Sequence, residues 1–82
     1  MPARKGQQTM VRSRLAVARV RAGLTQTQAA ERIGIGFATY RRLERGQIEN
    51  PPLRYLVNAT IVFGVELDEV IEDRWREWMP LG

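Results

Sequence analysis

The chain has 82 residues, which is the size of one small domain. It contains no cysteine and no histidine, so a disulfide scaffold, a thiol nucleophile and a zinc site with thiolate ligands are excluded. Most catalytic triads, acid–base sites and transition-metal sites use histidine. The composition therefore predicts a protein that is not an enzyme, with no catalytic residues, no metal and no cofactor.

The charge is distributed unevenly along the chain, whose formal net charge is +4. Residues 1–65 carry +8 and residues 66–82 carry −4. Twelve of the thirteen basic residues are arginine, and a guanidinium group pairs with phosphates and guanine edges through two parallel hydrogen bonds. A basic body with an acidic end indicates a polyanionic partner at one side only. Charge alone leaves a merely soluble basic protein equally open.

Targeting signals are not evident in the sequence. The N-terminus is positive, but no apolar run of about 7–15 residues follows it, as a secretory signal requires. No stretch approaches the roughly 18 apolar residues of a membrane span. Together with the lack of cysteine, this favours a cytoplasmic protein with no membrane partner.

The first 22 residues divide into an arm and a helix. Residues 1–9 are polar and are expected to form a flexible basic N-terminal arm. From Met10 to Ala22, apolar residues recur three to four positions apart, which predicts a helix. Gly23 is expected to end this helix, because glycine readily adopts the left-handed conformation found just after many helices.

Two short helices joined by a turn are expected next. Thr25 and Gln28 have the spacing of a capping box at the start of a second helix, and Gly34 is expected to end it. A third helix is expected over residues 37–45, closed by Gly46. Two short helices separated by such a turn make a helix-turn-helix motif.

Two further helices are expected after the motif. Asn50 and the two prolines that follow it are a start signal for a fourth helix, because asparagine caps a helix and proline fits its first turn. Gly64 is expected to end this helix. A fifth helix is expected over residues 65–73, and residues 74–82 are expected to form a C-terminal tail.

The helix-turn-helix positions resemble those of a known family. They are Leu24-Thr25-Gln26, Ala30, Ile33-Gly34, Tyr40 and Leu43-Glu44-Arg45-Gly46. The pattern is similar to the lambda-repressor/Cro-type DNA-binding domain of the XRE family of regulators, and the resemblance extends from residue 15 to residue 71. Ala30 is small where the third helix crosses over it, and Gly34 supplies a positive φ in the turn.

The resemblance implies a fold and a function. The expected fold is all-α, a five-helix lambda-repressor-like domain over residues 10–73 with the helix-turn-helix at helices 2 and 3. The expected function is that of a sequence-specific, double-stranded DNA-binding transcription regulator, most simply a repressor. The third helix, about residues 36–45, would read the major groove.

The resemblance also assigns two sets of DNA contacts. Contacts with base edges fall on the third helix, namely on Phe37, Ala38, Thr39, Arg41 and Arg42. Contacts with phosphates fall on the start of the second helix, the residues after the third helix and the arm, namely on Gln26, Arg45, Gln47, Arg4 and Lys5. Among these, Arg42 is the residue that we expect to contact guanine.

Several of these residues have a second interpretation. Arg41 and Arg42 would also suit a solvated helix face, and Phe37 would also suit packing within the domain. Gln26 would also suit a role in helix capping, and the two arm residues a disordered tail. Because Phe37 and Ala38 are apolar, base readout there would use contact with thymine methyl groups.

The resemblance also implies a structural ion pair between Arg19 on the first helix and Glu44 near the end of the third. Such a pair would tie the first helix to the recognition helix. If the pair is well buried, losing one partner would leave a buried charge uncompensated, at about 3–5 kcal/mol. The alternative is an exposed Arg19 that is free to touch phosphate.

Surplus apolar residues predict an interface with another chain. A single helix-turn-helix reads few base pairs, so we expect a homodimer on a pseudo-palindromic operator. The possible dimer or partner contacts are Val57, Ile61, Trp75 and Trp78. For both tryptophans, packing back onto the core is the competing interpretation. The alternative function is an antitoxin or adaptor that binds a protein partner mainly through its apolar C-terminal tail.

Overall fold

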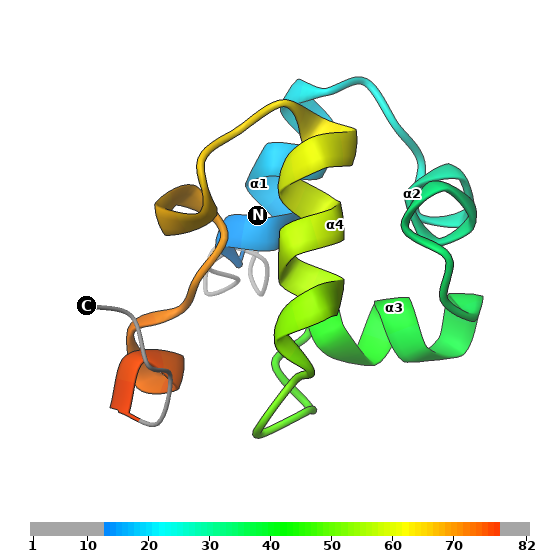
Figure 1. The fold of residues 1–82 in the computed structure, drawn as a ribbon. Helices are drawn as coiled ribbons and strands as arrows, with labels where there is room; N and C mark the ends of the chain where they lie inside the picture. The colour runs from blue at the N-terminus through cyan, green and yellow to red at the C-terminus, as the bar shows by residue number, and fades with distance from the viewer. Residues whose placement is uncertain (1–12, 78–82) are drawn as a thin grey trace, which may run out of the picture.

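The computed structural model describes residues 13–77, and within that range every regular element is helical. Four α-helices come first: α1 (Arg14–Arg21), α2 (Gln26–Ile33), α3 (Phe37–Glu44) and α4 (Leu53–Phe63). Two short 3₁₀ helices follow, η1 (Leu67–Glu69) and η2 (Asp73–Glu77). Figure 1 shows α4 in the middle of the molecule, with α2 beside it and α3 along one edge. No helix in the described range is long and apolar enough to cross a membrane.

The start of α1 lies later than the sequence predicts, because Ser13 is its N-cap. Ser13 has an extended backbone, and its hydroxyl accepts a 3.1 Å hydrogen bond from the amide of Ala16. The carboxylate of Glu72 accepts a 2.8 Å hydrogen bond from the amide of Arg14. A carboxylate at this end also suits the helix dipole. The first turn of α1 is therefore capped by one local residue and one residue that is distant in sequence.

The predicted ends of α2, α3 and α4 are confirmed. Thr25 and Gln28 form the complete capping box at the start of α2, with reciprocal hydrogen bonds of 2.9 and 3.1 Å. The glycines expected after these helices all have positive φ: 91° at Gly34, 75° at Gly46 and 70° at Gly64. These ends follow from local backbone chemistry, which is why the sequence predicts them.

The capping at the start of α4 differs from the prediction. The helix begins at Leu53, and the N-cap position is held by Pro52, which makes no side-chain capping bond. Asn50 lies two residues before that position and therefore does not cap the helix. Pro51 is fully buried, so this proline contributes packing at the base of α4.

The predicted fifth helix over residues 65–73 is wrong. Within that range residues 67–69 form a 3₁₀ turn with a capping box between Glu66 and Glu69, residues 70–72 are not helical, and Asp73 begins η2. Beyond η1, Arg14 donates a 3.1 Å hydrogen bond from Nη1 to the carbonyl of Ile71, and its amide binds Glu72. These contacts with α1 hold residues 71–72 in a non-helical conformation. Leu67 is partly buried and packs against the core.

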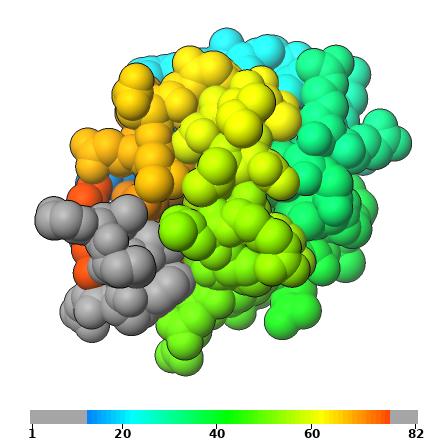
Figure 2. Space-filling view, viewed as in Figure 1, coloured from blue at the N-terminus to red at the C-terminus, as the bar shows by residue number. Residues whose placement is uncertain are grey.

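The core forms where the helices meet around α4, and it includes the C-terminal segment. Figure 2 shows α4 along the middle of one face, between the η1 segment and the helix-turn-helix. The buried cluster consists of Leu15, Ala18, Ala29, Ala30, Ile33, Tyr40, Leu43, Leu56, Ala59, Phe63, Val70, Ile71 and Trp75. Trp75 is 1% exposed, so the expected dimer or partner contact through this ring is wrong, and the competing interpretation holds. Trp78 lies outside the described residues.

Candidate nucleic-acid interface

The α2–turn–α3 unit has the geometry of a helix-turn-helix. Three residues, 34–36, separate the helices. Gly34 ends α2 in the left-handed conformation, and the amide of Ile35 donates a 3.0 Å hydrogen bond back to the carbonyl of Ala30. Ala30 is 2% exposed, as expected for a small residue between crossing helices. Gly36 is the N-cap of α3 and offers no side-chain acceptor.

Helix α3 has one buried and one exposed face. Its buried face is formed by Tyr40, Leu43 and Glu44. The predicted base-contact residues occupy the remainder: Phe37, Ala38 and Arg42 are exposed, while Thr39 and Arg41 are partly buried. Figure 1 shows α3 at an edge of the molecule, so the exposed face is accessible to a large ligand.

Phe37 and Arg41 lie one turn apart and interact. The Phe37 ring is 44% exposed, so it is not part of the core. The guanidinium carbon of Arg41 lies 5.6 Å from the ring centroid, within the range of a cation–π contact. The ring therefore restrains Arg41 against the helix, whereas Arg42 projects freely into solvent.

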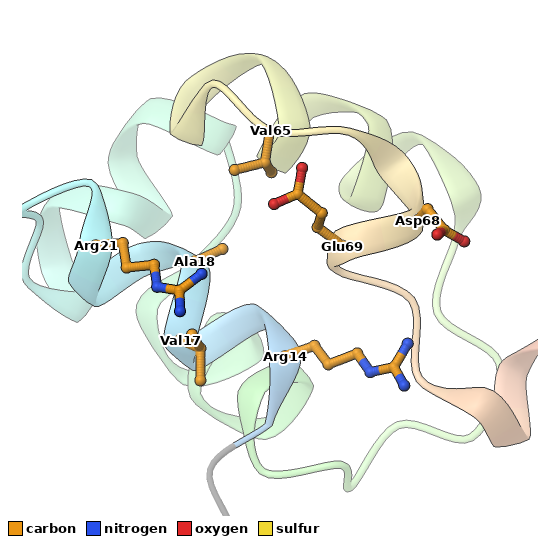
Figure 3. Close-up of a pocket in the computed structure, with 7 residues that line it drawn as sticks. All are labelled: Arg14, Val17, Ala18, Arg21, Val65, Asp68 and Glu69. Atoms are coloured by element: carbon orange, nitrogen blue, oxygen red, sulfur yellow. The ribbon is translucent and has the colours of Figure 1, made fainter.

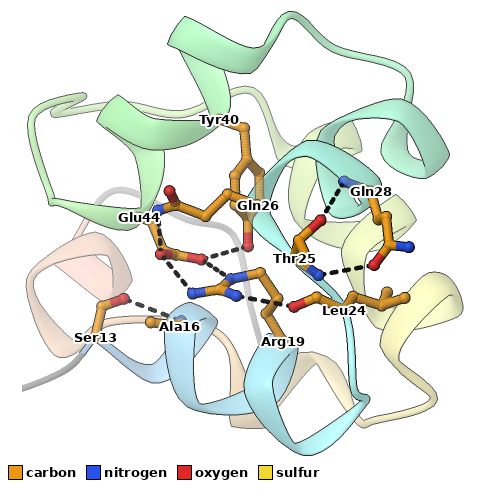
Figure 4. A network of polar contacts seen from close by, with 9 residues as sticks. All are labelled: Ser13, Ala16, Arg19, Leu24, Thr25, Gln26, Gln28, Tyr40 and Glu44. Carbon is orange, nitrogen blue, oxygen red and sulfur yellow. Dashed lines mark hydrogen bonds and ion pairs between the residues drawn. The ribbon is translucent and has the colours of Figure 1, made fainter.

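The predicted ion pair between Arg19 and Glu44 is present, and it is the centre of a larger network (Figure 4). Arg19 Nε lies 2.6 Å from Glu44 Oε2, and Arg19 Nη1 donates to the carbonyl of Leu24 at 2.9 Å. The Tyr40 hydroxyl donates to Glu44 Oε2 at 2.7 Å, and Gln26 Nε2 donates to Glu44 Oε1 at 2.9 Å. One carboxylate thus joins α1, α2 and α3.

The network sets the charge states of its members. Burial by itself would raise the pKa of Glu44, but the hydrogen bonds from Arg19, Tyr40 and Gln26 outweigh it and leave this pKa below its ordinary value. The hydrogen bond with Glu44 raises the pKa of Arg19. Burial, followed by the hydrogen bond with Glu44, raises the pKa of Tyr40. The site is therefore a carboxylate and a guanidinium with a neutral phenol beside them.

Gln26 has a partner that the sequence reasoning missed. It is the first residue of α2, where a phosphate contact was expected and a capping role was the alternative. Thr25 performs the capping, while the Gln26 amide is held by Glu44, eighteen positions away in the sequence. No local pattern reveals such a contact. The side-chain amide of Gln26 has two N–H donors, and the hydrogen bond with Glu44 needs only one of them.

The predicted phosphate contacts after α3 are on the surface. Arg45 and Gln47 are exposed, and they flank Gly46. The amide of Gln47 donates a 2.9 Å hydrogen bond to the carbonyl of Arg42, and the amide of Gly46 donates to that of Leu43 at 3.2 Å, which together form a Schellman motif. The motif fixes the direction in which the chain leaves α3. Arg4 and Lys5 lie outside the described residues.

A cavity of about 300 Å³ lies between α1 and η1 (Figure 3). Val17, Ala18 and Val65 form its apolar part, and charged side chains surround it. The Glu69 carboxylate on this rim accepts a 2.9 Å hydrogen bond from the backbone amide of Glu66. This carboxylate therefore already stabilises η1. Among residues 13–77, no cluster of acidic side chains has the make-up of a metal site.

Three large apolar side chains are exposed on α4, and besides Leu53 (37%) they include the two predicted contact residues. Val57 is 39% exposed and Ile61 is 75% exposed. They lie one turn apart, as predicted, and both face solvent in the isolated chain.

Comparison with known proteins agrees with this geometry. No curated protein and no solved structure matched the chain. A family model described as Helix-turn-helix (HTH_3) matches residues 15–70, which span most of α1, the whole of α2 to α4, and η1. This model represents the XRE-type, lambda-repressor-like domain, which binds double-stranded DNA. The chain therefore belongs to the XRE-type helix-turn-helix family of DNA-binding regulators.

Proposed function

We propose that this chain is a sequence-specific transcription repressor that binds a pseudo-palindromic operator as a homodimer, with α3 in the major groove. The observation that carries the proposal is the division of α3 into two faces. Tyr40, Leu43 and Glu44 anchor one face, and the opposite face presents Arg42 to solvent. We infer that the function is binding and not catalysis, and that it takes place in the cytoplasm.

The base contacts follow from the orientation of these side chains. Arg42 is long, exposed and free to pair bidentately with a guanine edge. Phe37 and Ala38, at the first turn of α3, would contact thymine methyl groups. Arg41, held against the Phe37 ring, would read a neighbouring base or its phosphate.

The phosphate contacts would flank α3 on both sides. Gln26 lies at the N-terminus of α2, where its second amide N–H and the free backbone N–H groups suit an anion. Arg45 and Gln47 would bind phosphates where the chain leaves the groove. Such contacts orient the domain on the duplex and carry no sequence information of their own.

Selection of bound duplexes from a random pool tests this proposal. We expect enrichment of a palindrome whose half-sites lie about 34 Å apart, one helical turn of DNA. A repressor role is then tested by placing the selected site over a promoter and measuring transcription with and without the protein. Failure to enrich any sequence would overturn sequence-specific binding, and increased transcription would overturn repression.

The dimer has its own test. Ile61 is the most exposed large apolar residue of the described chain, at 75%. Ile61→Ser should shift sedimentation toward the monomer. Val20→Ser alters another exposed apolar residue, on α1 (47%), and should leave sedimentation unchanged. A wild-type protein that stays monomeric on DNA would overturn the homodimer.

A truncated chain tests the alternative function, an antitoxin or adaptor, and the burial of Trp75 limits where the chain can be cut. Truncation after Asp73 would remove a core residue and unfold the domain, so the cut belongs after Glu77. Loss of DNA binding in that truncated chain would place DNA contacts in the tail. Loss of a protein partner with DNA binding intact would favour the adaptor.

A further inference from the structure

The three consecutive residues at the middle of η2 point in different directions. A 3₁₀ helix has about three residues per turn, so neighbouring side chains are about 120° apart. Trp75 enters the core. Arg76 pairs with the carboxylates of Asp68 and Asp73. Arg74 takes the third direction, and no acidic side chain described by the structure pairs with it.

Arg74 lies against the end of the recognition helix. A Cβ atom built on Gly46 would collide with Arg74 Nη2, and it would meet the guanidinium carbon at 3.2 Å and Nη1 at 3.3 Å. The guanidinium group therefore rests directly on the backbone of Gly46, the residue that closes α3. Glycine suits this position, because its φ of 75° would strain any other side chain and a Cβ atom would displace the end of the Arg74 side chain.

Trp75 fixes Arg74 in this place. The Trp75 ring is held in the core, and the guanidinium carbon of Arg74 lies 5.6 Å from its centroid. The amide of Trp75 donates a 2.9 Å hydrogen bond to the carbonyl of Glu72, which closes the first turn of η2. Arg74 is nevertheless exposed to solvent. An accessible cation thus lies against Gly46, whose neighbours in the sequence, Arg45 and Gln47, are also exposed.

We propose that Arg74 is a DNA-phosphate contact that the C-terminal segment adds to the helix-turn-helix. This inference rests on the proposed function, since it takes α3 to lie in the major groove. DNA phosphates border the groove on both sides, so a cation at the point where α3 leaves the groove meets the backbone. Together with Arg45, Arg74 forms a positive pair around Gly46.

A purely structural role for Arg74 predicts a different outcome. The C-terminal end of a helix carries a partial negative charge, which a nearby cation stabilises. If that were the whole role, removing the charge would lower the melting temperature and leave the salt dependence of DNA binding intact. The salt dependence of DNA binding therefore distinguishes a phosphate contact from a purely structural role.

The test is the slope of log binding constant against log salt concentration, measured by fluorescence anisotropy with a labelled duplex from the random-pool selection. Each phosphate contact contributes about 0.9 to this slope in double-stranded DNA. Arg74→Gln should reduce the slope by about that amount and weaken binding to selected and unrelated duplexes alike. Arg74→Lys retains a positive charge and should restore most of the slope.

Arg21→Gln is the matched control. It removes the same charge from an exposed position in the last turn of α1, and it should leave the slope unchanged. A slope that stays at the wild-type value in Arg74→Gln, or falls equally in Arg21→Gln, would overturn the role of Arg74 while leaving DNA binding standing. If the wild-type protein binds no duplex, the proposed function itself fails, and this inference fails with it.

Discussion

The hydroxyl of Tyr40 donates a 2.7 Å hydrogen bond to the carboxylate of Glu44, one turn further along α3. The Tyr40 side chain is completely buried. A buried phenol needs a partner for its hydroxyl group. Glu44 supplies that partner, so Tyr40 anchors the recognition helix through both packing and a polar bond.

Tyr40→Phe should therefore destabilise the domain while keeping its shape. The ring still fills the core, but the hydrogen bond to a charged group is lost, at about 1.5–3 kcal/mol. Urea denaturation measures the free energy of unfolding. Tyr55→Phe, which alters a partly buried tyrosine on α4, is the control. Equal stability of Tyr40→Phe and wild type would show that the bond contributes nothing.

Arg19→Met should destabilise the domain more strongly. The side chains of Arg19 and Glu44 are 15% and 7% exposed, so removing the guanidinium leaves a carboxylate largely buried and unpaired. The expected loss is about 3–5 kcal/mol. Arg21→Met changes an exposed arginine of the same helix and should have little effect on thermal melting. An unchanged melting temperature in Arg19→Met would contradict a buried ion pair.

Acid should weaken the fold through Glu44. Its pKa is lowered on folding from the ordinary value of 4.5, so the folded state holds this proton less readily than the unfolded state. The resulting stability is fully present above pH 4.5 and is lost as the pH falls through the folded pKa. Denaturation between about pH 6 and pH 3 should show a steeper fall for wild type than for Glu44→Gln.

Glu31→Gln, which changes an exposed carboxyl group on α2, provides the comparison for this acid titration. Its stability should follow the wild-type pH profile. Parallel profiles for wild type and Glu44→Gln would instead assign the acid sensitivity to other carboxyl groups.

Trp75→Ala should cost about 3–5 kcal/mol, because the ring is among the largest fully buried side chains. Trp75→Phe should cost much less. The Trp75 indole nitrogen is buried and finds no hydrogen-bond partner in the described structure, and phenylalanine removes that unpaired donor. Chemical denaturation at two protein concentrations provides the measurement. A stability loss that appeared only at low protein concentration would favour an interface role for Trp75.

Arg42→Ala should relax sequence specificity at one base position of each half-site. A bidentate arginine–guanine pair contributes about 1–3 kcal/mol of discrimination against other bases. Binding to single-base variants of the selected operator measures this effect. Arg32→Ala, at an exposed position in the last turn of α2, is the matched control. Undiminished discrimination at every position in Arg42→Ala would remove Arg42 from base readout.

The sequence alone determined the helix-turn-helix and the ends of most helices. Thr25, Gln28 and the glycines at 23, 34, 46 and 64 act on backbone groups within a few residues of themselves. Interactions over so few residues can be predicted from the amino-acid sequence alone. The assignment of base-contact positions to the third helix and the Arg19–Glu44 pair both followed from the resemblance to the family.

Tertiary structure decided the features that depend on distant partners. The contacts of Arg14 with residues 71 and 72 replaced the expected fifth helix by two 3₁₀ turns. From the sequence, Trp75 suited an interface and a thin core equally well, and the fold buries its ring in the core cluster. The hydrogen bond between Gln26 and Glu44 joins residues that are 18 positions apart. The contact of the Arg74 guanidinium group with Gly46 joins residues that are 28 positions apart. Such contacts arise only when packing brings separate helices together, so periodicity and capping signals carry no trace of them.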